Sequence, residues 1–271
     1  MRVRSKSILH EFQSSAGTDE PLQAALFHEH SKLTPYRRAE VGQRIAQLQS
    51  GGLVTRMTEA FKCYPALPQI ALPRAILELQ RPLQDIIAGR RSATRFDTSQ
   101  PTTLQALATI LQLSYGITGH KQLGSGVTQY VRAIPSGGAL YPLELYVMVS
   151  RVEGLEPGLY HYRVAHHALE QLDAGDDDLQ RIAADGAMMA SAAFHLIIAA
   201  VFARSLVKYR DRGYRFVLME AGGLATQAGL VAECQGVHTC LLGGFLDDEM
   251  NRLCGLDGVD EAVVLCAAFG Q

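Results

Sequence analysis

One apolar run, Phe194 to Ala203, constrains the fold of this chain more than any other stretch. It reads FHLIIAAVFA, and together with the small and apolar residues before it the run extends back to Ala187. It is slightly short for a membrane span, and Ser191 and His195 interrupt it. A continuous apolar run of this kind is typical of a strand that is covered on both faces of its sheet. We therefore expect the end of a helix followed by a fully buried strand, and no membrane segment.

A cationic stretch, SLVKYRDRGYRF from Ser205 to Phe216, follows the buried run almost at once. It combines four cations with two phenols, namely Lys208, Arg210, Arg212 and Arg215 with Tyr209 and Tyr214. Charge runs usually face solvent, so the residues alone favour a solvated connector whose arginines pair with Asp211 and nearby carboxylates. The alternative is a functional cluster at the end of a buried strand.

Composition excludes several classes of protein. The 271 residues are 48% hydrophobic and 19% charged with a formal net charge of −2, which is typical of a globular domain and gives no basic field for general nucleic-acid binding. The five cysteines include no C-x-x-C pair, and the FHEH run that ends at His30 lacks the H-E-x-x-H spacing, so we expect no metal site. The basic amino terminus has no apolar core after it, so we expect a cytoplasmic protein without a signal peptide.

The chain changes character near residue 80. Residues 1–80 have weak periodicity and a proline-punctuated end, and we expect an arm or small subdomain there, while residues 81–271 alternate helical and strand patterns. Helices are expected at 82–90, 102–116, 177–190, 215–236 and 247–256, and strands at 158–163, 168–172, 194–203, 237–242 and 261–270. This order predicts an α+β or α/β layered domain. The GSGV run at Gly124 does not match a dinucleotide-binding fingerprint.

A cluster of cations surrounds a hydroxyl at a predicted helix exit, in GRRSATRF from Gly89 to Phe96. Arg90, Ser92 and Arg95 carry groups that can hold a phosphate through charge-assisted hydrogen bonds. An ordinary solvated helix end, with cations near its carboxyl terminus, explains the same residues. The segment alone favours neither reading.

Two glycine turns flank predicted strands. RAIPSGGALYP, from Arg132 to Pro142, precedes one strand, and LLGGF, from Leu241 to Phe245, ends another. Glycine lets a backbone approach a flat ligand closely, and proline fixes the entry to a turn. Plain turns beside strands would need the same residues.

These motifs, in this order, resemble the flavin-dependent nitroreductase superfamily, and within it the SagB-type or McbC-type branch of azoline dehydrogenases in thiazole/oxazole-modified peptide biosynthesis. The resemblance runs from about Pro82 to the end and rests on PSGGALYPLELYV, KYRDRGYRFVLMEAG and LLGGF. It implies an α+β fold with a central mixed sheet flanked by helices, an intertwined homodimer, and FMN at the subunit interface.

The resemblance also assigns roles to residues. Arg90 and Ser92 match the phosphate clamp of the family, but Thr94 stands where a basic residue is usual, so Arg95 is expected to substitute and Arg132 to add a compensating charge. The P-S-x-G loop of the family lies against the flavin of the partner subunit, and it matches Pro135, Ser136, Gly137 and Gly138. The turn that approaches flavin N5 matches Gly243 and Gly244.

Lys208 and Tyr209 match the Lys-Tyr pair that this branch uses in azoline oxidation. The reaction removes a proton from the ring Cα and a hydride from the neighbouring carbon, so a base is needed beside the flavin. Burial and the nearby arginines are expected to lower the pKa of Lys208 toward a working range, and Tyr209 to hydrogen-bond the ring nitrogen or relay the proton. Neighbouring residues of a strand point to opposite faces, so we expect the chain to turn at Lys208.

The sequence thus predicts an FMN-dependent dehydrogenase of thiazoline or oxazoline rings on a ribosomally made precursor peptide, working beside an ATP-dependent cyclodehydratase that docks on the arm. The alternatives are an NAD(P)H-dependent nitroreductase or quinone reductase, a dehydrogenase of carrier-bound thiazolines, and a non-catalytic scaffold subunit.

Further expectations concern three histidines and one glutamate. His161, like His166 and His167, flanks a predicted hairpin and is expected to face water. Glu220 lies within the apolar pattern of a helix and needs a partner such as Arg215 or a backbone amide.

Overall fold

The computed structural model describes residues 23–50, 61–79, 81–123, 126–172 and 179–271. The amino terminus expected to lack a signal peptide, the GSGV glycine at 124 and the first residues of the helix expected at 177–190 lie outside these ranges. The chain forms two compact units, residues 1–40 and residues 41–271.

A seven-stranded sheet forms the centre of the larger unit, with the strand order β1-β8-β7-β5-β9-β11-β10. Its strands are β1 (Gln69–Ala71), β5 (Leu143–Val149), β7 (Gly158–Arg163), β8 (Ala168–Leu172), β9 (Phe194–Val201), β10 (His238–Leu242) and β11 (Glu261–Gly270). All neighbouring pairs in this sheet are antiparallel. The expected α+β class is confirmed, whereas the expected mixed pairing is corrected. β7 and β8 form a hairpin, and the longer connections between the other neighbours also return the chain in the opposite direction.

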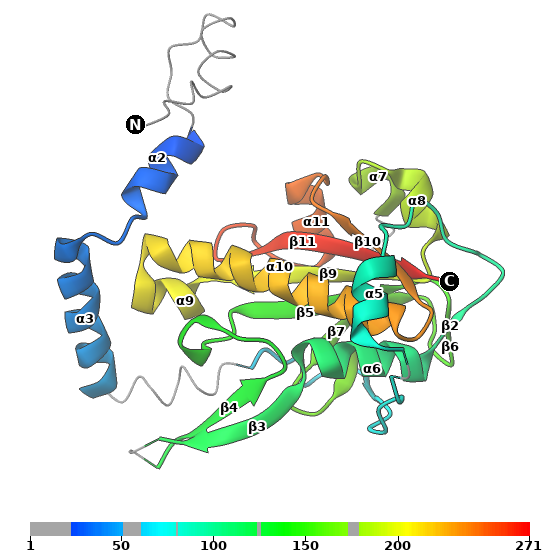
Figure 1. Cartoon of the computed structure of the whole chain (residues 1–271), viewed down its shortest axis with the longest axis horizontal. Coiled ribbons are helices and arrows are strands. Elements are labelled where there is room, and N and C mark those ends of the chain that lie inside the picture. Colours follow the sequence, from blue (N-terminus) through cyan, green and yellow to red (C-terminus); the bar gives the residue numbers. More distant parts are fainter. Residues whose placement is uncertain (1–22, 51–60, 80, 124–125, 173–178) are drawn as a thin grey trace, which may run out of the picture. The chain divides into compact units, whose positions relative to one another are not determined.

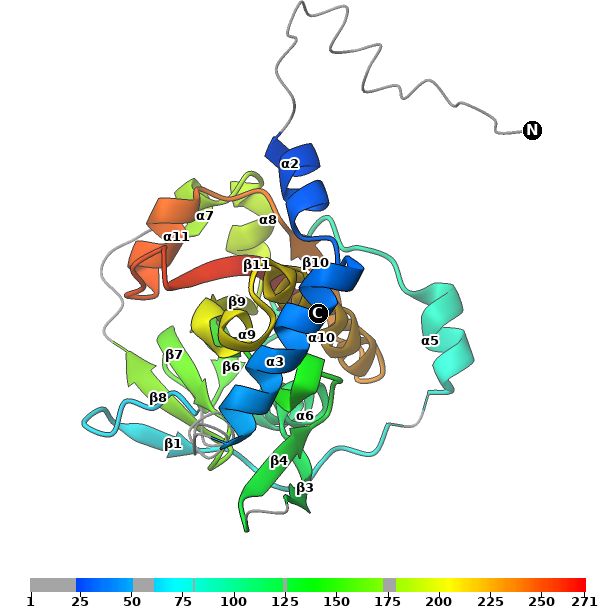
Figure 2. The ribbon, with the colours of Figure 1, turned by 90° about the vertical axis from the view of Figure 1, so that its left-hand side faces the viewer.

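Helices cover both faces of the sheet (Figures 1 and 2). One face packs against α6 (Leu104–Tyr115) and α10 (Asp211–Glu233), and the other against α7 (Leu179–Ile182), α8 (Gly186–Ser191) and α11 (Asp247–Leu253). A hydrophobic core lies on each face of the sheet, and alternate residues of a strand pack into one core or the other, because successive side chains of a strand point to opposite faces. In β9, for example, Leu196 and Ile198 join the first core, and Ile197 and Ala199 join the second.

The apolar run 194–203 supplies the central strand β9 with its first eight residues, and its last two residues begin the helix that follows. The strand pairs with β5 on one side and β11 on the other, and Phe194 stacks on Phe269 with ring centroids 4.8 Å apart. The expected helix end followed by a buried strand is therefore confirmed, with Ser191 closing α8. Among the described residues, no helix is long and apolar enough to cross a membrane.

The cationic stretch folds as a helical hairpin at the end of β9. Helix α9 (Phe202–Tyr209) follows the strand directly, and Arg210, with φ 51°, turns the chain into α10. Gly213 permits the close approach of the two helices, because a Cβ there would lie 2.9 Å from the Ser205 carbonyl oxygen. The expected turn at Lys208 is confirmed, since this residue belongs to the last turn of α9 (Figure 1).

Shorter elements surround this core. They are α5 (Leu83–Gly89), the β3 (Ile117–Gln122) and β4 (Thr128–Arg132) hairpin, the β2 (Thr102–Thr103) and β6 (Val152–Glu153) pair, and one turn of 3₁₀ helix, η1 (Gly137–Ala139). Figure 2 shows α5 projecting from the sheet layers. Of its residues only Ile86 is buried.

The residues before position 81 do not all belong to an arm. β1 pairs with β8 in the main sheet, and Lys62 and Tyr64 bond to strand residues of the larger unit. The compact units divide at Glu40 and Val41, well before the expected boundary near residue 80. Within the proline-punctuated run 64–73, whose extended path was expected, Gln69–Ala71 form the edge strand β1.

Two helices begin within the first 40 residues. α2 (Gln23–His30) has no buried residue, and α3 (Pro35–Ser50) starts in the smaller unit and continues past its end. The FHEH run lies on α2, whose side chains are exposed. No group of three or more potential metal ligands occurs among the residues that the structure describes.

Candidate functional site

The glycine loop before β5 meets the end of α9. A Cβ added to Gly138 would lie 2.5 Å from the Tyr209 hydroxyl and 2.7 Å from Lys208 Nζ, so both side chains lie directly against this glycine. Gly138 has φ +69°, a conformation in which L side chains are strained. Both Lys208 and Tyr209 are half-buried. Because Lys208 and Tyr209 lie in the last turn of α9, both side chains reach the loop at Gly138. This arrangement lets them act on one ligand.

The same loop borders a pocket on α10. The tip at Gly137 contacts Phe216, whose ring also packs edge-on against Tyr209 at 4.9 Å between centroids. Beyond Phe216 the pocket encloses about 400 Å³. Its lining comes from the loop and from one face of α10: Ile134, Pro135, Ser136, Gly137, Phe216, Met219, Glu220, Gly223 and Gln227. Gln227 Nε2 donates to the Leu113 carbonyl of α6 and to the Ala133 carbonyl, which lies between β4 and the loop.

Glu220 places a carboxyl group at the wall of this pocket. It is 5% exposed, and Tyr115 donates a hydrogen bond to its Oε1 at 3.3 Å. The Tyr115 hydroxyl accepts from the Leu143 amide, so its single proton is free for Glu220. Burial raises the pKa of Glu220 to about 7, although the Tyr115 hydrogen bond, the nearby Ser136 hydroxyl and the charge of Arg132 oppose the rise. Tyr115, Ser136 and Arg132 are therefore groups that the structure places around Glu220.

Arg132 is the last residue of β4, and its side chain is buried. Its guanidinium carbon is 4.4 Å from the centroid of Tyr115, 4.9 Å from that of Tyr141 and 5.3 Å from that of Phe61. The side chain is 7% exposed. The three rings form an aromatic cage around the guanidinium, and the charge of Arg132 acts on Glu220 nearby. Its expected role as a compensating charge for a phosphate stays a prediction.

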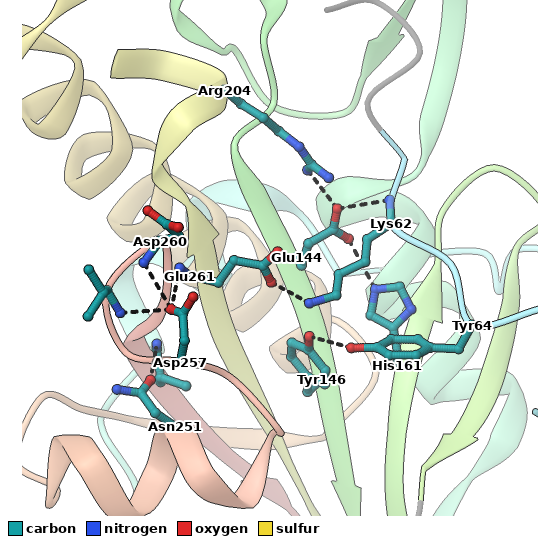
Figure 3. A network of polar contacts seen from close by, with 12 residues as sticks. Lys62, Tyr64, Glu144, Tyr146, His161, Arg204, Asn251, Asp257, Asp260 and Glu261 are labelled. Atoms are coloured by element: carbon teal, nitrogen blue, oxygen red, sulfur yellow. Dashed lines mark hydrogen bonds and ion pairs between the residues drawn. The ribbon is translucent and has the colours of Figure 1, made fainter. Parts of the chain in front are cut away.

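A buried polar network fixes α9 behind the loop (Figure 3). Arg204, one turn before Lys208, pairs with Glu144 at 2.6 Å and donates to the Tyr141 carbonyl at 3.3 Å. The other Glu144 oxygen is 3.1 Å from His161 Nε2, and His161 Nδ1 is 2.9 Å from Glu170. Burial raises the pKa of Glu144, but Arg204 and His161 outweigh it and hold this pKa at about 2.

The network also corrects one expectation. His161 is fully buried and does not face water, because β7 lies inside the sheet and its inward positions are covered. His167 is also buried, whereas His166 is exposed as expected.

The predicted phosphate clamp lies at the other end of the sheet. Ser92 forms a parallel bridge with Thr239, and the Ala93 amide donates to the Thr239 carbonyl at 3.0 Å. Phe96 is buried against Gly270, where a Cβ would come within 2.8 Å of it. Ser92 and Arg95 are exposed and Arg90 is half-exposed. The segment is thus attached to β10, the strand that leads into the second glycine turn.

The second glycine turn is held firmly on one side and open on the other. The Gly244 carbonyl accepts from the Ala184 amide at 2.9 Å, and the Leu246 amide donates to the Ile182 carbonyl. A Cβ added to Gly243 would meet nothing within 4 Å in this chain. The open side of the turn leaves its backbone accessible to a flat ligand.

The predicted site residues therefore form two groups within one chain. The loop group consists of Pro135–Gly138, Lys208 and Tyr209, near the start of α10, and the clamp group consists of Arg90, Ser92, Arg95, Gly243 and Gly244, near its end. Phe216 contacts the first group, whereas Gly229 contacts Thr239 of the strand that carries the second. Thirteen residues of helix separate these two contacts, which corresponds to roughly 20 Å. One chain does not bring the two groups together.

Several residues of the site carried no clear signal in the sequence. Tyr115 and Phe216 belong to helix patterns that core packing explains equally well. Glu144 was detectable, because a glutamate inside the apolar strand LELYVMV must find a buried partner. That Glu144 pairs with His161 follows only from the register of the strands.

Comparisons with known proteins agree on the family. Residues 87–271 match the model of the nitroreductase family. The chain is 35% identical over 185 residues to the nitroreductase-family protein MJ1384 of Methanocaldococcus jannaschii, covering 65% of this chain and 89% of that protein. It is 33% identical over 147 residues to the microcin B17-processing protein McbC of Escherichia coli, covering 52% of this chain and 54% of McbC.

Solved structures give the same picture of the fold. A nitroreductase-family protein of Anabaena variabilis superposes with a TM-score of 0.66 at 27% identity, covering 91% of this chain and 45% of that chain. A chain of the E. coli microcin synthetase McbBCD complex with truncated pro-MccB17 bound superposes with a TM-score of 0.57 at 21% identity, covering 89% of this chain and 98% of that chain. The latter similarity is one of fold.

Proposed function

The chain belongs to the nitroreductase family and is similar to McbC within it, and on that premise we propose that it is an FMN-dependent dehydrogenase of azoline rings on a peptide. The observation that carries the proposal is the joint contact of Lys208 and Tyr209 with Gly138. An amine and a phenol thereby lie against the backbone of the loop that is expected to contact a flavin.

The residues present fit a flavin mononucleotide. Gly137 and Gly138 offer backbone that a planar ring can approach, and the pocket beside them has about 400 Å³. Arg90 and Ser92 offer a guanidinium and a hydroxyl for the phosphate, with Arg95 close in sequence. The turn at Gly243, where a Cβ would meet nothing within 4 Å, offers open backbone in the same group. When bound, FMN supplies an acceptor for the hydride that leaves the substrate.

Lys208 acts as the base in this proposal. Oxidation of an azoline breaks two C–H bonds: the Cα proton goes to the Lys208 amine, and the hydride leaves from the neighbouring carbon. Tyr209 hydrogen-bonds the ring nitrogen through its hydroxyl, which orients the Cα hydrogen toward the amine. The Arg204–Glu144 pair holds the helix that carries both residues, so it is a positioning element.

A second copy of the chain completes the site in this proposal. α10 exposes apolar side chains, with Leu218 43% and Met219 60% exposed, beside the small residues Gly222 and Gly223. This exposed apolar stripe of α10 is expected to be buried against a partner. A two-fold homodimer would set the clamp group of one copy against the loop group of the other.

The peptide substrate and the partner are inferred from the relatives. McbC is a microcin B17-processing protein, and one solved structure that this chain resembles in fold is the microcin synthetase McbBCD complex with truncated pro-MccB17 bound. We infer a precursor peptide as substrate and an ATP-dependent cyclodehydratase as partner, because azolines must be formed before they are oxidised. Residues 1–40 form a compact unit of their own, and its exposed Leu26, Phe27, Leu33 and Tyr36 offer a docking surface.

The proposal is tested by two substitutions at one position. Lys208→Ala removes the amine, and Lys208→Arg keeps a cation that does not deprotonate in proteins. Both variants are expected to retain bound FMN and to lose azole formation on an azoline peptide, followed by absorbance and by a mass loss of two hydrogens. Lys121→Ala, on the exposed β3 strand, is the matched control with unchanged turnover. Full turnover in Lys208→Arg would remove Lys208 from the role of base.

A second candidate function is supported by the similarity to MJ1384, which covers 89% of that nitroreductase-family protein. In this case the enzyme reduces nitro compounds or quinones with NAD(P)H. Rapid bleaching of bound FMN by NAD(P)H, without turnover of azoline peptides, distinguishes it. A chain that takes up no FMN on reconstitution would instead be a scaffold subunit.

A further inference from the structure

The pocket on α10 contains a polar atom that the described residues leave without a partner. Glu220 Oε1 accepts from Tyr115, whereas Oε2 is buried and has no hydrogen-bond partner at normal distance. Glu220 also lines the pocket, between Met219 and Gly223 on the same helix face. A buried carboxyl oxygen without a partner is costly unless something pairs with it. This oxygen therefore marks a place where a ligand atom gains a hydrogen bond.

The surroundings of the carboxyl group favour its neutral form. The charged and titratable groups that act on it from packed elements are Tyr115 of α6 and Arg132 of β4, while the loop contributes the Ser136 hydroxyl. Desolvation outweighs all three, and the pKa of Glu220 is raised to about 7. A neutral carboxyl group can donate one hydrogen bond from the oxygen that Tyr115 does not occupy.

The position of Glu220 relates it to the proposed catalytic pair. The loop lies between them: Lys208 and Tyr209 contact Gly138, Phe216 contacts Gly137, and Glu220 interacts with Ser136. A planar ligand along this loop would have the amine and phenol at one side and the carboxyl group at the other. Two ionisable groups with different environments then serve one ligand.

We propose that Glu220, in its protonated form, is a recognition residue of this pocket that donates a hydrogen bond from its free carboxyl oxygen to an acceptor atom of the bound flavin ring. The inference rests on the proposed function, because it takes FMN as the ligand. Binding then keeps the proton on Glu220, and at a pH where the free protein has lost it, one proton is taken up from solvent on binding.

The direction of this coupling follows from charge and desolvation. FMN is an anion, and the rim of its ring is rich in carbonyl and imine acceptors. Covering the pocket withdraws Glu220 further from water, which disfavours the carboxylate. An ionised Glu220 would present two acceptors to an acceptor-rich rim. FMN affinity should therefore fall as the pH rises through the pKa of Glu220.

The test measures FMN affinity by fluorescence quenching at pH 6 and pH 8 in three proteins. They are the wild type, Glu220→Gln, and Glu233→Gln as the matched control. Glu233 is on the same helix and equally buried, but lies beyond the pocket, where it contacts His238. Because the flavin phosphate also titrates, each protein is compared with the same ligand over the same range.

With a pKa of about 7, the dissociation constant of the wild type should rise roughly tenfold more between pH 6 and pH 8 than that of Glu220→Gln. Glu233→Gln should follow the wild type. Tyr115→Phe, which removes a hydrogen bond that lowers the Glu220 pKa, should move the transition to higher pH. This variant keeps the test available if Glu220→Gln does not fold.

Two results overturn the inference while FMN still binds. One is the same pH course in the wild type and in Glu220→Gln, and the other is an affinity that rises with pH, which would mean that the carboxylate accepts from the ligand. If the wild type binds no FMN at any pH, the proposed function fails together with the inference.

Discussion

Replacing Gly138 by alanine separates the functional role of the loop from its structural role. The new Cβ would lie 2.5 Å from the Tyr209 hydroxyl and 2.7 Å from Lys208 Nζ, whereas ordinary contacts begin near 3.4 Å. Both atoms are the far ends of flexible side chains, so they relieve the clash by moving away by roughly 0.9 Å. The substitution therefore displaces the proposed base and phenol without touching them chemically.

Two costs are expected, and they differ in size. The positive φ of Gly138 adds about 1–2 kcal/mol of backbone strain for a residue with a Cβ, which lowers the unfolding temperature. A displacement of about 1 Å at reacting groups can reduce turnover by about 100-fold. Gly255 is the matched control, because its φ is +67° and a Cβ there would meet nothing within 4 Å.

The assay compares Gly138→Ala with Gly255→Ala in unfolding temperature, FMN occupancy and azole formation. Both variants should lose similar stability, but only Gly138→Ala should lose turnover by about 100-fold. If Gly138→Ala turns over peptide as fast as Gly255→Ala, then Lys208 and Tyr209 do not work at the loop. Their shared contact with Gly138 would then have no part in catalysis.

Three further predictions concern charge and assembly. The pKa of Glu144 is held at about 2 against a usual 4.5, so ionised Glu144 contributes roughly 3 kcal/mol of stability, which is complete above pH 4.5 and lost as the pH falls to 2. In Glu144→Gln the unfolding temperature should therefore fall less between pH 4.5 and pH 2 than in the wild type, and an equal fall would contradict this. The pKa of Glu220 is raised from 4.5 to about 7, so the wild type should lose roughly 3 kcal/mol of stability as the pH rises from 4.5 to 7. Chemical denaturation should show a smaller loss in Glu220→Gln, and equal losses in the two proteins would contradict the raised pKa. Met219→Asp, on the exposed stripe of α10, should convert a dimer into monomers in sedimentation experiments and lower FMN occupancy, and a stable dimer would locate the interface elsewhere.

Local patterns were sufficient for most elements of the larger unit. The apolar run 194–203 gave the central strand because a continuous apolar segment must be covered on both faces, and the small residues of 215–236 gave the long helix. The extent of the sheet was harder to predict. β1 has only three residues, and its pairing with β8 follows from tertiary contact and not from its own sequence.

The candidate site was predictable where a motif carries its own geometry. The loop at Pro135–Gly138 and the pair Lys208–Tyr209 were identified from sequence, and the structure brings them into contact. The surroundings of Arg132 were not predictable, because the three aromatic rings that enclose its guanidinium come from separate segments of the chain. The network of Glu144, His161 and Glu170 depends on strand register, which no local pattern specifies.

The central claim is that two copies of the chain share each site, and subunit mixing tests it most directly. One subunit carries Arg90→Ala with Ser92→Ala and the other carries Lys208→Ala, so that neither homodimer has an intact site. If the clamp group of one copy meets the loop group of the other, each mixed dimer regains one intact site, and equal mixing restores about a quarter of the wild-type azole formation. If all these residues act within a single chain, the mixture remains inactive although mixed dimers form, and the account is contradicted.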